Sequence, residues 1–161
     1  MLPKTTVELD QLRDECKSMV TARSSLSAGA AVVPVPGVDI GADIALLVEM
    51  IPAINKKFGL SQEQIEQLNP QVRNLIFVAA TGVGNEMIGK VITQQLIAQV
   101  LKKIGIRIAT KSIIKYIPIL GSAVAATISF GAMKLIGKSH VDDCYAVVKK
   151  ILLTTESGQS L

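Results

Sequence analysis

Apolar residues recur at helical spacing along most of the chain, and residues that start or stop helices separate the segments. Near the N-terminus, Thr5 and Glu8 have the spacing of a capping box. The helical pattern continues to about Val33, where the sequence Pro34-Val35-Pro36-Gly37 interrupts it. Proline lacks an amide donor and disfavours helix in the residue before it, so a first helix is predicted from Thr5 to about Val33.

The middle of the chain contains three further helix boundaries. A very apolar helix is predicted from Asp39 to Ile54, with Gly59 after its end. Ser61 and Gln64 have the spacing of a second capping box. Asn69-Pro70 is typical of a cap followed by proline at the first helical position, so another helix is expected to start there.

Glycine and proline divide the second half of the chain into further helical segments. The predicted helices run from 70 to about 80, Asn85 to Lys103, Ile106 to Ile117, Gly121 to Ile136, and Ser139 to about Leu153. Ser139 and Asp142 are the expected cap of the last helix. Residues 155–161 are expected to form a frayed tail. The sequence therefore predicts an all-α fold, with residues 1–161 forming a single helical bundle domain of six to seven helices.

Two proline turns share a local pattern. Val33-Pro34-Val35 with Gly37 matches Ile117-Pro118-Ile119 with Gly121, and small residues follow each turn. Small residues allow helices to approach closely, so the pattern predicts two proline-broken helical hairpins. Chance or a shared hairpin requirement explains this short match about as well as duplication does. The predicted structural turns are Pro34, Pro36, Gly37, Pro118 and Gly121.

The composition shows a surplus of apolar residues. Apolar residues make up 49% of the chain and charged residues 19%, whereas charged residues make up about 25% of an average soluble domain. This surplus indicates either an unusually well-buried core or a surface reserved for a membrane or a partner subunit. The aromatic content is only 3% and tryptophan is absent. Because stacking platforms for single strands need aromatic rings, no nucleic-acid partner is expected.

Basic residues surround the apolar centre of the second half. Between Met87 and Val141 there are eight Lys or Arg residues and no Asp or Glu. The predicted helix Ile106 to Ile117 carries basic residues at every fourth position and isoleucines opposite them, which is typical of a helix lying on an anionic membrane surface. A solvated face over a protein core is the alternative. The predicted membrane or partner contacts are Lys103, Arg107, Lys111, Lys115, Ile106, Ile113 and Ile117.

An uncharged segment from Tyr116 to Met133 follows the basic helix. As a helix rising about 1.5 Å per residue it would extend roughly 27 Å, just short of the roughly 30 Å hydrocarbon thickness of a bilayer. Pro118 and Gly121 lie near one end of it. A marginal membrane span and a central buried helix of a soluble bundle are both consistent with this segment.

One motif imitates a phosphate-binding loop. Gly84 is followed, at the required spacing, by Gly89-Lys90, but Val91 occupies the position where Ser or Thr would hold magnesium. The preceding Ile76-Phe77-Val78 is the candidate strand, while Asn85 to Ile88 are expected to be helical. No guanine-reading Asn-Lys-x-Asp sequence is present. The motif is therefore predicted not to bind a nucleotide.

Candidate catalytic and metal-binding residues are few. His140 is the only histidine, which excludes a site with two or more imidazoles, and it is expected to lie at a helix start beside Ser139. Cys16 and Cys144 are expected to be reduced and buried, since they stand far apart in predicted helices. A cysteine nucleophile would need that single histidine as its partner. We therefore expect no catalytic residue, metal or cofactor, and a protein that is not an enzyme.

Several stretches resemble the helical domain of the immunity-related, interferon-inducible GTPases. The first is Ala30 to Asp39, followed by Ala42 to Leu47 and Phe58-Gly59-Leu60; Tyr116 to Gly121 and Ile128 to Cys144 are similar to its second half. The chain is also similar to bacterial helical modules of unknown function attached to Era-like GTPases. The resemblance implies a helical part that packs beside a separate GTP-binding domain and associates with membranes. It also implies membrane contact through an amphipathic helix before the second proline turn, where this chain has Ile106 to Ile117.

The sequence thus predicts a non-catalytic helical module for membrane association or scaffolding. No GTP-binding domain is recognised in the chain, so a GTPase partner is expected to act in trans, together with an anionic membrane surface. The expected location is cytoplasmic and peripheral to a membrane. Two alternatives remain: a small integral membrane or pore-forming protein that inserts its apolar hairpins, and a soluble homo-oligomeric scaffold that buries its apolar surplus between subunits.

Overall fold

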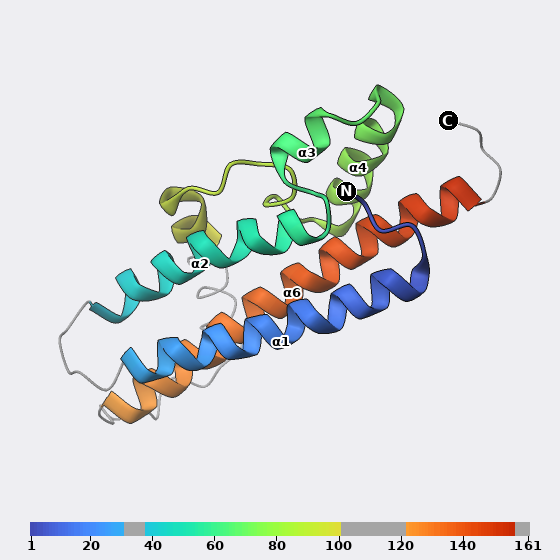
Figure 1. Ribbon diagram of the computed structural model, residues 1–161. Helices are drawn as coiled ribbons and strands as arrows, with labels where there is room; N and C mark the ends of the chain where they lie inside the picture. The colour runs from blue at the N-terminus through green and yellow to red at the C-terminus, as the bar shows by residue number, and fades with distance from the viewer. Residues whose placement is uncertain (31–37, 101–121, 157–161) are drawn as a thin grey trace.

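The computed structural model describes residues 1–30, 38–100 and 122–156, and these residues form a helical bundle (Figure 1). The helices are α1 (Thr6–Ala30), α2 (Val38–Lys57), α3 (Gln62–Glu66), α4 (Pro70–Val83) and α6 (Ser122–Glu156). Residues 94–100 are also helical, and none of the described residues lies in a strand. The predicted all-α fold is confirmed.

Two long helices form the base on which the rest of the bundle packs. Helices α1 and α6 lie side by side along much of their lengths, and α2 packs against both (Figure 1). Helix α4 contacts α6 as well. The loop that follows α4 is thereby held close to the same core.

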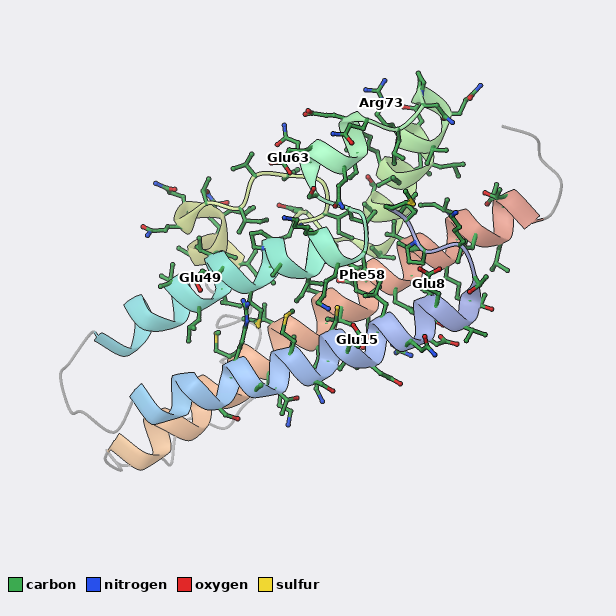
Figure 2. All side chains as sticks on the ribbon, viewed as in Figure 1. Glu8, Glu15, Glu49, Phe58, Glu63 and Arg73 are labelled. Atoms are coloured by element: carbon green, nitrogen blue, oxygen red, sulfur yellow. The ribbon has the colours of Figure 1, made fainter. Side chains whose placement is uncertain are left out.

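Buried apolar side chains occur every third or fourth residue on the facing sides of these helices, as an amphipathic helix requires. In α1 they are Leu9, Cys16 and Val20; in α2 they are Leu47, Met50, Ile51 and Ile54; in α6 they are Met133, Ile136, Val141, Cys144, Val147, Val148, Ile151 and Leu152. Phe58, labelled in Figure 2, is fully buried just beyond the end of α2. Each fully buried side chain of this size stabilises the fold by about 1.5 to 3 kcal/mol relative to exposure.

Several of the predicted helix starts in the described residues are confirmed. The Ser61 hydroxyl accepts a hydrogen bond from the amide of Gln64, whose side chain accepts one from the Ser61 amide, so the capping box of α3 is complete. Asn69 caps α4 by accepting from the amide of Val72, and Pro70 occupies the first helical position.

The long helix α6 corrects the prediction for the C-terminal part. Two helices were expected, Gly121 to Ile136 and Ser139 to about Leu153, but α6 is continuous over 35 residues. The predicted cap at Ser139 and Asp142 is therefore wrong. Asp142 instead binds side chains on α1. Tertiary packing overrides the local capping pattern, and five helices are delimited in the described residues instead of six to seven.

The expected helix from Asn85 is a second correction. The residues from Asn85 to Thr93 form turns and irregular structure, and helix resumes only at 94. The hydroxyl and the carbonyl of Thr93 accept hydrogen bonds from the amides of Leu96 and Ile97, which marks the start of that helix. The side chain of Asn85 bonds to the amide of Met87 and so stabilises a turn in place of a helix.

Gly137 marks the closest approach of the three long helices. A Cβ atom at this position would lie 2.7 Å from Val20 Cγ1 on α1 and 2.9 Å from Met50 Cε on α2. A Cβ atom at Gly131, on the same helix, would meet nothing within 4 Å among the described residues. Gly137 therefore allows both neighbouring helices to pack against the α6 backbone.

These two glycines provide a matched test of the packing. Gly137→Ala is expected to lower the free energy of unfolding by about 1 to 3 kcal/mol, because overpacking outweighs the gain in helix propensity. Gly131→Ala is expected to raise it by about 0.5 to 1 kcal/mol, because alanine favours helix and no neighbour has to move. Urea unfolding of both variants measures the difference, and equal effects at the two positions would contradict the close approach.

Candidate functional site

The predicted membrane contact lies outside the described residues. This holds for its charged members, Lys103, Arg107, Lys111 and Lys115, and for its apolar members, Ile106, Ile113 and Ile117. It also holds for the predicted turns at Pro34, Pro36, Gly37, Pro118 and Gly121. The assignment of these residues therefore stays a prediction from the sequence.

The apolar segment Tyr116 to Met133 is described only from Ser122 onwards, where it forms the first part of α6. Across 1–30, 38–100 and 122–156, no helix combines the length and the apolar character that a membrane span needs.

The motif that imitates a phosphate-binding loop has a different structural context. The candidate strand Ile76-Phe77-Val78 lies inside α4, and Gly84 ends that helix in the left-handed conformation with φ of 71°. A phosphate-binding loop follows a strand and opens a helix, whereas this segment follows a helix and ends it. The glycine spacing is explained here by a helix C-cap and a turn.

A buried polar cluster occupies the space between α2, α6 and the loop that follows α4. Its members are Asn55, Asn85, His140, Asp143 and Cys144, which come from three separate parts of the sequence. His140 lies at its centre and is only 1% exposed. The prediction that His140 lies at a helix start is therefore wrong, because it lies in the interior of α6 and points into the core.

The partners of His140 fix the proton on one ring nitrogen. Nε2 lies 2.8 Å from Asn55 Oδ1, and Nδ1 lies 2.9 Å from Asn85 Nδ2. An amide oxygen can only accept and an amide nitrogen can only donate, so Nε2 carries the hydrogen and Nδ1 accepts. The ring is thus neutral, and burial lowers the pKa of His140 to about 3.

The remaining amide groups of the cluster tie the loop to the bundle. Asn85 Nδ2 also donates to Asp143 Oδ2 at 2.8 Å, and Asn85 Oδ1 accepts from the amide of Met87 at 2.8 Å. Asn55 Nδ2 donates to the carbonyl of Met87 at 2.9 Å. Among the described side chains, no buried nitrogen or oxygen lacks a hydrogen-bond partner. A fully satisfied network of this kind stabilises one arrangement of the loop against α2 and α6.

Cys144 brings a thiol into the same cluster. Its Sγ lies 3.6 Å from both Asn55 Oδ1 and His140 Nε2, so cysteine, histidine and asparagine meet as they do in some cysteine nucleophile sites. However, Nε2 already carries a hydrogen and Nδ1 is already bonded, so the ring has no free position to accept the thiol proton. Burial also raises the pKa of Cys144 well above its ordinary value. A buried neutral thiol of this kind is unreactive, and the geometry is that of a structural cluster.

The exposed edge between α1 and α6 contains a second polar group of residues. Asp142 Oδ1 accepts from Arg13 Nε at 2.8 Å and lies 2.8 Å from Lys17 Nζ. Burial of Asp142 works to raise its pKa, but the hydrogen bonds from Lys17 and Arg13 outweigh it and lower the pKa. The Arg13 guanidinium also lies 4.6 Å from the centre of the Tyr145 ring. Because these groups are partly exposed, each pair adds at most about 1 kcal/mol and serves mainly to align the two helices.

Metal binding finds no support in the described part of the chain. No three His, Cys, Asp or Glu side chains are gathered there in a way that could hold an ion. Cys16 and Cys144 are both buried free thiols, as the sequence predicts.

The spacing of His140 and Cys144 in the sequence is one signal for the buried cluster. His140 and Cys144 are four residues apart and continue the apolar spacing of Met133, Ile136, Val147 and Ile151. A polar residue at a core position of a helix indicates a buried hydrogen bond. Its partners, Asn55 and Asn85, come from distant segments that only the folded chain brings together.

The described residues form an all-α helical bundle, and hydrogen bonds of the buried polar cluster hold the loop that follows α4 against it. The chain is 28% identical over 137 residues to interferon-inducible GTPase 5 of Bos taurus. The match covers 82% of this chain but only 29% of that protein, so the chain spans less than a third of its length. Neither a protein-family model nor a solved structure gives a significant match. The similarity agrees with the resemblance to a helical part of an immunity-related GTPase.

Proposed function

We propose that this chain is a non-catalytic helical module that works beside a GTP-binding domain and associates with an anionic membrane surface. The observation that carries the first part is the similarity over 82% of the chain to a portion of an interferon-inducible GTPase. The described helices contribute a scaffold: α1, α2 and α6 share one buried core. A bundle with one shared core can position a contact segment, here the predicted helix Ile106 to Ile117 (the predicted contact helix), relative to a neighbouring domain.

The distribution of charge supports the membrane part of the proposal. Basic residues recur every fourth position from Lys103 to Lys115, and no Asp or Glu occurs from Met87 to Val141. Each Lys or Arg near an anionic bilayer contributes about 1 kcal/mol of attraction. Three or four such residues on one helix face, with isoleucines opposite, are enough for salt-sensitive binding.

Charge reversal on the contact helix tests this proposal. The triple variant Arg107→Glu, Lys111→Glu and Lys115→Glu is expected to lose binding to vesicles containing anionic lipid, by about 100-fold or more, because three attractions become repulsions. Co-flotation with phosphatidylserine vesicles and with neutral phosphatidylcholine vesicles measures the loss.

A matched control distinguishes the effect of substitutions in the predicted contact helix from the effect of a change in net charge alone. The triple Lys4→Glu, Lys56→Glu and Lys150→Glu changes the formal charge by the same amount, and all three side chains are exposed. It is expected to retain most of the binding, and both triples should keep the circular dichroism of the wild-type chain. If the two triples bind equally well, the contact helix is not the membrane-binding element.

A further inference from the structure

A groove lies on the side of the molecule formed by α3, α4 and the loop that follows α4. It has a volume of about 300 Å³. Ile65, Phe77 and Val91 form its apolar part, while Glu66, Arg73 and Lys90 contribute charges. We call it the α3–α4 groove. None of the residues of the buried polar cluster lines it.

The apolar part of the groove is accessible to a partner. Phe77 is 48% exposed and Val91 is 68% exposed, whereas Ile65 beneath them is buried. The chain has only three phenylalanines, and this one lies open to solvent on α4. Partly exposed aromatic side chains beside a pocket are the kind of residue that anchors protein interfaces.

The charges around the groove are mainly positive and unpaired. Within the described residues, neither Arg73 nor Lys90 has a carboxylate within ion-pair distance. Glu66 is the one acidic lining residue, and its carboxylate accepts a hydrogen bond from Gln62 Nε2 at 2.8 Å. Figure 2 shows Arg73 on α4, in the same part of the molecule as α3. An incoming carboxylate would therefore find two cations that form no ion pair within the described part of the chain.

The loop that borders the groove is held in place before any partner arrives. Gly89 adopts a φ of 71°, which favours glycine, and a Cβ atom there would lie 2.9 Å from Ile65 Cδ1, so the turn at Gly89 packs closely on Ile65. Earlier in the same loop, both backbone polar groups of Met87 are bonded to asparagine side chains of the buried cluster. A preformed groove loses little conformational entropy when it binds.

We propose that the α3–α4 groove binds an acidic amphipathic segment of a partner protein, with an apolar side chain placed over Phe77 and Val91 and carboxylates beside Arg73 and Lys90. A second copy of this chain is a poorer occupant, because the chain carries a net charge of +4 and a symmetric contact would bring each basic rim against another. The proposal does not depend on membrane binding.

A pair of helical peptides tests the proposal on the full chain. One is an amidated peptide of about 14 residues with leucines on one face and glutamates on the other, and the second has lysines in place of the glutamates. The glutamate peptide should give saturable amide chemical-shift changes centred on Ile65, Phe77, Gly89 and Val91. The lysine peptide should bind at least about tenfold more weakly.

A charge-swap variant makes the test specific to the groove. The double variant Arg73→Glu with Lys90→Glu should lower the affinity for the glutamate peptide by at least about tenfold and raise the affinity for the lysine peptide. Lys56→Glu with Lys150→Glu changes the net charge equally, affects no residue that lines the groove, and should alter neither affinity. The proposal would be overturned if both peptides bound equally well or if the groove variant kept the wild-type affinity. It would also be overturned if the chemical-shift changes were centred elsewhere or reported only self-association of the chain.

Discussion

Asn55→Ala is expected to lower the free energy of unfolding by about 2 to 5 kcal/mol. The substitution leaves the Nε2–H of His140 and the carbonyl of Met87 without partners in a buried position, and each unsatisfied group costs about 1 to 3 kcal/mol. It also detaches the loop after α4 from α2. Urea unfolding followed by circular dichroism at 222 nm measures the loss.

A second asparagine serves as the control. Asn74 is exposed on α4, and Asn74→Ala is expected to change the unfolding free energy by no more than about 0.5 kcal/mol. Hydrogen exchange should also show faster opening at Met87 in Asn55→Ala than in Asn74→Ala. A loss below about 1 kcal/mol for Asn55→Ala would show that the cluster contributes little to stability.

Acidification from pH 7 to pH 5 is expected to remove about 2 kcal/mol of stability through His140 alone. Burial lowers the pKa of His140 in the folded chain to about 3, while an unfolded histidine titrates near 6.5. The unfolded state therefore binds the proton first. The stabilisation is complete above about pH 6.5 and falls by about 1.4 kcal/mol per pH unit as the pH drops towards 3.

The two carboxyl groups with shifted pKa values act differently from the histidine. Burial raises the pKa of Asp143, partly offset by the hydrogen bond from Asn85, so its proton favours the folded chain and opposes the histidine effect at lower pH. Asp142, with its lowered pKa, loses its contribution only in more acidic solution. The contribution of the histidine is therefore measured as the difference between the wild-type chain and a variant without it.

The single histidine makes the control simple. His140→Gln has no imidazole to titrate, so its stability should differ by less than about 0.5 kcal/mol between pH 5 and pH 7, even though the variant is less stable at both. A wild-type chain that is equally stable at both pH values would contradict the neutral buried imidazole. If the free energy of unfolding of His140→Gln fell as steeply with pH as that of the wild-type chain, groups other than His140 would cause the pH dependence.

Local sequence signals predicted the helix boundaries well. The Ser61 box, the Asn69-Pro70 start and the turn at Gly59 all appear in the structure. At the N-terminus the Thr5 hydroxyl accepts from the Glu8 amide as expected, although the Glu8 carboxylate bonds to the Lys4 amide. These boundaries depend on hydrogen bonds within four residues, so the sequence contains the whole interaction.

Longer-range interactions explain what the sequence did not predict. A capping pattern at Ser139 and Asp142 did not end the helix, because Asp142 finds stronger partners in Arg13 and Lys17 on α1. Likewise, the position of His140 depends on Asn55, 85 residues away in the chain. Such contacts follow from how α1, α2 and α6 pack, which neither helix propensity nor capping rules determine.

Flotation of the purified chain with anionic and neutral vesicles, followed by high-salt and carbonate washes, tests the central claim most directly. A peripheral module held by Lys103 to Lys115 should float only with anionic vesicles and be released by about 0.5 M salt, because screening at that ionic strength removes most of the surface attraction. Carbonate-resistant binding would contradict a peripheral module and indicate insertion. No flotation with either vesicle would contradict membrane association itself.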